Sequence, residues 1–492
     1  MNAVPGSRWS GLQRWGVVVI AIVAAGGCSR RPLRTHTEKT MQQPTKPTRP
    51  SIYVATNRNV DLLFLIDDST SMRESQDNLL RNFPVLMKTL KNLPGGLPNI
   101  HVAVVSSDMG AGDGLIGSCN STGGKRGIFQ NTARGTCTAT GLATGARFIS
   151  NIAGAANYSG NLEDVFTCIA ALGDQGCGFE RQFGAITRSL GVDGQSAPVE
   201  NAGFLRNDAL LAIVMITNED DCSSGIGENF YDVTSNSNIA SQLGPIQNFR
   251  CNEFGHICDG DAPDREPPNN DPSAMVSYQS CMSNEKGFLL AVQDTADRIK
   301  SLKADDGQIM LTAITGPATP YVVQWKEPMS ADTSCGAASC PWPVIEHSCM
   351  ATDRSYADPA VRIAELVGKF GDNGRLVSIC EADFAPALGN VASNIARYVN
   401  APCILGRVAK RPGTTADDCT VVDADTAHTV ASCDDTGGAG ECWHLVPGGD
   451  SCAGVSVVVQ ADPGGGGDPP GNLTVRCTMC TPGVPDAEVG CP

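Results

Sequence analysis

Three oxygen-bearing side chains stand at alternate positions in one short segment of this 492-residue chain. Asp67, Ser69 and Ser71 form a D-x-S-x-S pattern, which lets a carboxylate and two hydroxyls converge on one side of a tight loop. Hard divalent cations such as Mg²⁺ prefer oxygen ligands of this kind. The same residues also suit a polar turn that caps the next helix. The pattern therefore predicts a cation site, with a helix cap as the alternative.

The elements on both sides of this loop favour the cation site. Residues 60–66 are an almost unbroken apolar run, which is typical of a central strand in a parallel sheet covered on both faces. Apolar residues then recur at helical spacing over residues 73–93, where Pro84 is expected to start or kink the helix. The strand, the loop and the helix together resemble the metal-ion-dependent adhesion site of von Willebrand factor type A domains.

The resemblance implies a role for each of the three residues. In type A domains the two serines bind the cation directly, and the aspartate usually acts through a water molecule. One coordination position stays open for an acidic group on a partner. The implied cofactor is a divalent cation, either Mg²⁺ or else Mn²⁺ or Ca²⁺, and the implied partner is a protein that could offer an acidic side chain.

Two further loops of the family's site have looser counterparts here. The strand expected over residues 209–217 is followed by Asn218, where the family usually has an aspartate. An amide carries no charge, so cation affinity should fall unless Glu219 or Asp220 substitutes. The family's middle-loop threonine has no clear match, and Glu180 is the residue best placed to contribute an oxygen instead.

Alternating strand and helix patterns between residues 58 and 400 predict an α/β fold with a doubly wound, mostly parallel sheet, as in a type A or other Rossmann-like domain. Further strands are expected over residues 100–106, 308–315 and 375–380, and helices over 161–172, 180–190, 285–303, 359–370 and 383–399. The region is longer than a minimal type A domain. We expect the surplus in disulfide-stapled insertions at residues 110–158, 222–284 and 316–356.

The first 28 residues have the composition of an export signal. Two arginines precede an apolar run over residues 16–25, and small residues lead up to Cys28. This cysteine resembles the lipidated first residue of bacterial lipoproteins, and the absence of aspartate after it resembles those delivered to the outer membrane. An uncleaved anchor is the alternative. These features predict an outer-membrane or cell-surface lipoprotein that touches the membrane through its lipid alone.

The chain has 21 cysteines, and the 20 that remain without the lipidated one can all pair. Twelve lie between Cys119 and Cys380 and eight between Cys403 and Cys491, so each region can close its own bridges. Export favours disulfides, with zinc as the alternative for close pairs. Proximity in sequence suggests three bridges: Cys119–Cys137, Cys168–Cys177 and Cys251–Cys258.

Two segments adjoin the expected α/β domain. Residues 29–57 are rich in Pro, Thr, Gln and Lys, and they predict a disordered linker because hardly any apolar side chain is available for a core. Residues 401–492 contain eight cysteines and few long apolar runs, which predicts a small module stapled by disulfides. Continuation of the α/β domain is the alternative for this segment.

Charge and composition restrict the function. The net charge is −16, and it becomes −18 once the two arginines of the signal are removed, so nucleic acid and anionic lipid are disfavoured as partners. No histidine pairs with a nucleophile by spacing, and the sequence has no H-E-x-x-H motif. We therefore expect a protein-binding adhesion protein and not an enzyme. The alternatives are a structural envelope protein without a functional metal site and, with less support, a hydrolase.

Overall fold

The computed structural model describes residues 51–55, 58–93, 96–111, 119, 123–225, 229–231, 238–245, 247–304, 306–328, 332–399, 403–404, 407–423, 426–447, 455–460, 473–480 and 491. The predicted signal with Cys28, and residues 29–50 of the predicted linker, lie outside these residues. Within the described ranges, no helix has both the length and the apolar character needed to cross a membrane.

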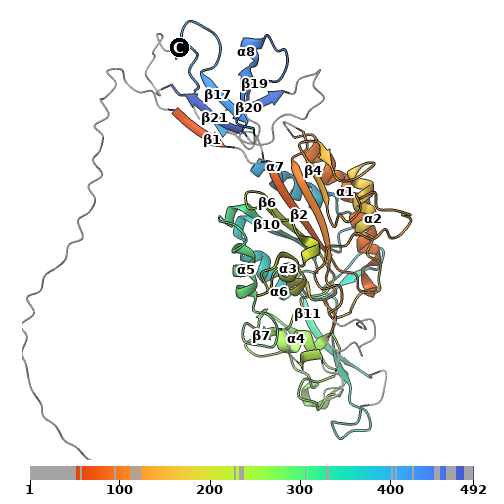
Figure 1. Cartoon of the computed structure of the whole chain (residues 1–492). Helices are drawn as coiled ribbons and strands as arrows, with labels where there is room; N and C mark the ends of the chain where they lie inside the picture. The colour runs from red at the N-terminus through yellow and green to blue at the C-terminus, as the bar shows by residue number, and fades with distance from the viewer. Residues whose placement is uncertain are drawn as a thin grey trace, which may run out of the picture. The chain divides into compact units, whose positions relative to one another are not determined.

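A seven-stranded sheet forms the centre of the α/β region (Figure 1). Its strand order is β15-β10-β6-β2-β3-β4-β5, and the first five of these are parallel. The parallel strands are β2 (Asn59–Ile66), β3 (Asn99–Ser106), β6 (Leu210–Ile216), β10 (Ile309–Thr315) and β15 (Gly374–Ser378). Antiparallel β4 (Ile149–Ile152) and β5 (Ala155–Ala156) complete one edge. The five strands expected from apolar runs are therefore confirmed.

Helices cover both faces of this sheet (Figure 1). One face is covered by α1 (Arg73–Lys91), α2 (Leu162–Ala170) and α7 (Ala385–Val399), and the other by α3 (Gln182–Leu190), α5 (Val292–Lys300) and α6 (Val361–Gly368). Because alternate side chains of a strand point to opposite faces, Leu62 and Phe64 of β2 pack in the first layer, and Leu63 and Leu65 in the second. All four are fully buried. The doubly wound, mostly parallel α/β fold is confirmed.

One helix begins later than its sequence pattern predicts. The apolar pattern extends over residues 285–303, whereas α5 starts at Val292. Glu285 lies before the helix, where its carboxylate accepts hydrogen bonds from the backbone N–H groups of Val292 and Gln293, both at 3.0 Å. These are donors that a helix leaves unsatisfied at its start, so Glu285 caps the helix from the preceding loop. Pro84 also lies inside α1 and does not start it.

The described residues contain nine disulfides, and each stays within one of the two predicted regions. They are Cys119–Cys177, Cys137–Cys168, Cys222–Cys251, Cys258–Cys281, Cys335–Cys340, Cys349–Cys380, Cys419–Cys477, Cys433–Cys442 and Cys480–Cys491. The pairings Cys119–Cys137, Cys168–Cys177 and Cys251–Cys258 are wrong, although all six cysteines are bonded. A disulfide requires that the two Cα atoms lie close together. The fold brings the Cα atom of Cys177 to 4.2 Å from that of Cys119.

The insertions contain small elements that bear on the site. The second holds α4 (Phe249–Gly255), β7 (His256–Cys258), β8 (Met275–Tyr278) and β9 (Cys281–Ser283), and the third holds β11 (Tyr321–Lys326), β12 (Trp342–Ile345), β13 (Cys349–Met350) and β14 (Tyr356–Ala357). Strands β13 and β14 form a hairpin whose tip is residues 351–355. The disulfide of Cys349 with Cys380 ties this hairpin to the segment after β15.

A second seven-stranded sheet, with the order β1-β21-β17-β18-β19-β20-β16, contains the C-terminal strands. Its members are β1 (Ser51–Ala55), β16 (Cys403–Ile404), β17 (Cys419–Asp423), β18 (Thr429–Ser432), β19 (Cys442–Pro447), β20 (Val455–Gln460) and β21 (Leu473–Thr478). Because β1 pairs with β21 in antiparallel register, the linker prediction is wrong for residues 51–55. Ile, Tyr and Val in this segment favour a strand once a partner strand is present.

Candidate cation site

The loop that begins at Asp67 lies where the strand order of the sheet reverses. Strand β2 has β3 on one side and β6 on the other, and all three run parallel. In doubly wound sheets a crevice opens at this point, outside the carboxyl ends of the strands. Asp67 donates its backbone N–H to Ile216 at the end of β6 (3.0 Å), and Ser107 donates to Ile66 at the end of β2 (3.3 Å). Three neighbouring loops therefore meet at one edge.

Asp67 is fully buried and anchors these loops. One carboxylate oxygen accepts hydrogen bonds from the Ser69 backbone N–H (2.8 Å) and the Ser107 hydroxyl (3.3 Å), and the other accepts from the Thr217 hydroxyl (2.7 Å). Burial raises the pKa of Asp67, while these hydrogen bonds oppose the rise. Since both oxygens are held from behind the loop, Asp67 orients its neighbours.

The two serines of the motif lie together, as the sequence predicts. The Oγ atoms of Ser69 and Ser71 are 3.5 Å apart. The amide of Asn218 reaches Ser71 Oγ, with its Nδ2 at 3.0 Å and its Oδ1 at 3.2 Å, and Nδ2 also donates to the Tyr356 carbonyl (3.1 Å). The fold thus brings Asn218 to the loop, where it connects Ser71 to β14 as a neutral group.

Two glutamates meet beside these hydroxyls. Glu180, just before α3, is only 2% exposed, whereas Glu219 is partly exposed. The two carboxyl groups lie close enough to influence each other's ionisation, and Glu219 accepts a hydrogen bond from Asn248 Nδ2 at 2.6 Å. Burial raises the pKa of both well above the usual range for Glu, and the negative charge of Asp67 adds to the rise in each. The second oxygen of Glu180, Oε1, is buried and has no hydrogen-bond partner among the described residues.

A pocket of about 510 Å³ opens in front of these groups. It is lined by Ser69, Thr70, Ser71, Glu74, Gly178, Glu180, Glu219, Asp353, Arg354, Ser355 and Tyr356. The residues from 353 to 356 belong to the β13–β14 hairpin, so the third insertion forms one wall of the pocket. Sequence reasoning missed these wall residues, since nothing in their local pattern indicates that the hairpin lies over the loop after β2.

Asp220 does not face the serines. One oxygen of its carboxylate lies 2.8 Å from His256 Nε2, and the two oxygens accept the backbone N–H groups of Arg362 (2.8 Å) and Ile363 (3.1 Å) at the start of α6. Burial opposes ionisation, but the interactions with His256 and Arg362 outweigh it and lower the pKa of Asp220. Asp220 therefore caps a helix, and Glu219 is the acidic residue that the chain places near Ser71.

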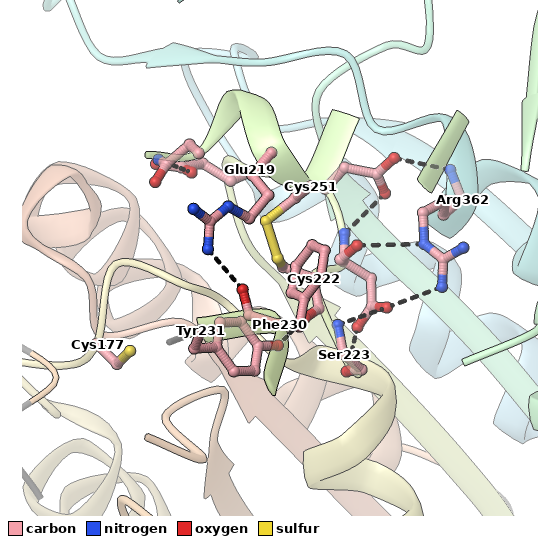
Figure 2. Close-up of a disulfide and its surroundings, with 12 residues drawn as sticks. Cys177, Glu219, Cys222, Ser223, Phe230, Tyr231, Cys251 and Arg362 are labelled. Carbon is pink, nitrogen blue, oxygen red and sulfur yellow. Dashed lines mark hydrogen bonds and ion pairs between the residues drawn. A yellow bond between two sulfur atoms is a disulfide. The ribbon is translucent and has the colours of Figure 1, made fainter. Parts of the chain in front are cut away.

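A disulfide and a buried arginine lie in the region around Glu219 (Figure 2). The Cys222–Cys251 disulfide and the two glutamates line a small cavity of about 20 Å³. Arg362, labelled in Figure 2, is fully buried and pairs with Asp221 at 3.2 Å. Breaking a buried ion pair leaves an uncompensated charge and is strongly destabilising. The disulfide and the Arg362–Asp221 pair should therefore hold the backbone next to Glu219 in place.

The second residue of the motif, Asp68, ties the middle loop to the cation loop. It is fully buried, pairs with Lys125 and accepts a hydrogen bond from the Ser106 hydroxyl (2.7 Å). Gly176 donates its backbone N–H to the Asp68 carbonyl (2.7 Å), and a Cβ atom at this glycine would collide with the Asp68 carboxylate. No local sequence pattern indicates the pairing with Lys125, because the lysine is more than fifty residues away in a loop.

The donor set fits a hard cation, although it differs from an all-acidic cluster. Among the residues that the structure describes, no group of three or more His, Cys, Asp or Glu side chains is placed to hold a metal ion. The candidate site instead combines the hydroxyls of Ser69 and Ser71 with the carboxylates of Glu180 and Glu219. Oxygen donors suit Mg²⁺, Mn²⁺ and Ca²⁺. Within the described residues, Glu180 Oε1 has no hydrogen-bond partner, so this oxygen is available to bind a cation.

Comparison with known proteins adds little to this geometry. No protein-family model matches the chain, and no curated protein does. Among solved structures, the chain is similar to a von Willebrand factor type A protein from Catenulispora acidiphila, with 9% sequence identity and a TM-score of 0.27 over 90% of this chain and 68% of that chain.

The glutamate pair predicts a pH dependence of stability in chelator. Folding raises the pKa of the Glu180 carboxyl, so the folded protein keeps a proton that the unfolded chain releases once the pH exceeds the ordinary Glu pKa of 4.5. The free energy of unfolding therefore falls as the pH rises from 4.5 through the pKa of the folded state. Glu180→Gln removes this titration. We expect its melting temperature to fall less than that of the wild type between about pH 5 and pH 8.

Thermal unfolding in EDTA measures this difference, and Glu74→Gln is the matched control because Glu74 is an exposed carboxylate that lines the same pocket. The control should follow the wild type. Parallel pH profiles for all three proteins would show that the Glu180 carboxyl does not titrate abnormally.

Proposed function

We propose that this protein is an exported, lipid-anchored protein-binding protein whose type A-like domain uses a divalent cation held at the loop after β2. The observation that carries the proposal is the pocket in which the hydroxyls of Ser69 and Ser71 meet the carboxylates of Glu180 and Glu219 at the reversal of strand order. Ligands of doubly wound folds bind at this place. The proposal describes a binding protein and not an enzyme.

The residues around the pocket have separable roles in this proposal. Ser69 and Ser71 would bind the cation through their hydroxyls, and Asp67 would hold the loop in shape from behind. A bound divalent cation would supply a positive charge and a coordination position for an oxygen atom of the partner. Arg354 and Tyr356 of the hairpin line the opening, so they would contact the partner's neighbouring groups.

Hydrogen bonds fix the loop before any ligand arrives. Gln76 donates its side-chain amide to the Asp67 carbonyl and to the Gly173 carbonyl, both at 2.8 Å, and its Oε1 accepts the Gly173 backbone N–H at 3.0 Å. The amide of Gln182 donates to the Thr217 hydroxyl at 2.9 Å. Binding groups held by such supporting contacts lose less entropy when a ligand binds.

The cation is tested with the double variant Ser69→Ala/Ser71→Ala, because removal of the buried Asp67 would disturb the fold itself. Titration calorimetry with Mg²⁺, Mn²⁺ and Ca²⁺ should give binding heats for the wild type and none for the variant. Thr70→Ala is the control: Thr70 is the exposed residue between the serines, and its variant should bind like the wild type.

The same proteins test partner binding. Immobilised wild type should capture a partner from envelope extracts, and both chelator and the double variant should abolish the capture. Equal heats from the wild type and the double variant would mean that the loop is only a helix cap. Capture of a partner that is unchanged by chelator would favour the structural envelope role.

Export and anchoring have their own test, since Cys28 lies outside the described residues. Replacing Cys28 with Ser should abolish acylation and move the protein to the soluble fraction. The measurement is mass spectrometry of the mature N-terminus together with fractionation of cells. A variant that stays in the membrane with its first 27 residues intact would show that the segment is an uncleaved anchor.

A further inference from the structure

Glu180 occupies the middle loop of the site, where the type A resemblance implies a threonine. Its loop packs directly on the cation loop, because the backbone N–H of Gly176 donates to the Asp68 carbonyl at 2.7 Å. Glu180 itself lines the same pocket as Ser69 and Ser71. The side chain is 2% exposed, and its Oε1 lacks a hydrogen-bond partner within the described residues. A buried oxygen without a partner calls for a ligand or an ion.

Glu219 is fixed beside it by its backbone. The Glu219 carbonyl accepts a hydrogen bond from the Gln182 side-chain amide at 3.2 Å and lies 3.2 Å from the Thr217 hydroxyl oxygen. Its carboxylate accepts a hydrogen bond from Asn248 Nδ2 at 2.6 Å and lines the same pocket as Glu180. Both glutamate side chains are therefore placed by the fold, and both line the pocket.

The charges around this pair do not balance. The negative charge of Asp67 acts on both Glu180 and Glu219 and disfavours their ionisation. The nearby Lys125 pairs with Asp68, and Arg354 of the pocket lining is exposed. Carboxylates packed together in this way repel each other unless a proton or a positive charge lies between them. A cation in direct contact with both would relieve the repulsion and satisfy the free oxygen of Glu180.

We propose that Glu180 and Glu219 are direct ligands of the cation, so that this chain binds Ca²⁺ in preference to Mg²⁺ and needs no carboxylate from a partner. The proposal deepens the proposed function and rests on it, because Ser69 and Ser71 supply the remaining protein oxygens. Two carboxylates that can each bind through one or both oxygens suit the high and flexible coordination number of Ca²⁺, whereas Mg²⁺ keeps most of its waters.

The partner's chemistry follows from the charge of the site. The carboxylates of Asp67, Glu180 and Glu219 already offset the two positive charges of the cation. A carboxylate from the partner would bring a further negative charge to a site in which no positive charge is left unbalanced. The oxygen that completes the coordination is therefore a neutral one, such as a hydroxyl or carbonyl group of the partner.

Calorimetry on chelator-stripped protein tests the proposal, with Ca²⁺ and Mg²⁺ as probes in the presence and absence of acetate. The wild type should bind Ca²⁺ more tightly than Mg²⁺, and acetate should not strengthen the binding. Glu180→Gln should weaken Ca²⁺ binding by about tenfold or more, because ligand charge sets affinity. Glu74→Gln removes a carboxylate from the pocket rim and should stay within about twofold of the wild type.

Glu180→Thr is the second variant, and it introduces the threonine that the type A resemblance implies at this position. It also provides a second test in case Glu180→Gln does not fold. We expect it to lose the preference for Ca²⁺ and to bind Mg²⁺ more tightly when acetate is added. Unchanged Ca²⁺ affinity in both Glu180 variants, with binding lost in Ser69→Ala/Ser71→Ala, would overturn this proposal and leave the proposed function standing. Binding that survives in the serine variant as well would overturn both.

Discussion

The carboxylate of Asp67 is the group on which the rest of the site depends. It accepts hydrogen bonds from Ser69, Ser107 and Thr217, which follow β2, β3 and β6. These three strands are neighbours in the parallel sheet, so a single buried side chain joins the loops on both sides of the reversal in strand order. The cost of burying this carboxylate is offset only while all three loops keep their places.

The surrounding insertions complete what the Asp67 network begins. Asn218 carries the connection from β6 to the hairpin, since its amide contacts both Ser71 and the Tyr356 carbonyl. The bridge between Cys349 and Cys380 anchors the far end of that hairpin. A long insertion would otherwise be free to move, and its residues could not form a fixed wall of the pocket. Disulfides and buried polar contacts thus add to the small hydrophobic clusters that the insertions form.

Short sequence patterns predicted the buried strands of the sheet and the loop that holds Asp67, Ser69 and Ser71. The apolar runs of β2, β3 and β6 are visible in the sequence because strands buried on both faces can carry few polar residues. The spacing of Asp67, Ser69 and Ser71 likewise places them close together in one tight loop. Both the doubly wound sheet and the first loop of the site follow from such short-range regularities.

Features that depend on distant partners could not be read in this way. Cys119 pairs with Cys177 and not with Cys137, because the sheet and not the intervening chain sets which loops meet. Asp220 faces the start of α6, a partner more than a hundred residues away. The same limit hides the role of β1, whose pairing with β21 joins segments near the two ends of the described chain.

The central claim is that the pocket beside β2 holds a divalent cation through serine hydroxyls and glutamate carboxylates. A crystal structure of the protein grown with Mn²⁺, with an anomalous difference map, tests it most directly. The account predicts one strong anomalous peak in contact with the oxygens of Ser69, Ser71, Glu180 and Glu219. A map with no peak in this pocket would contradict it.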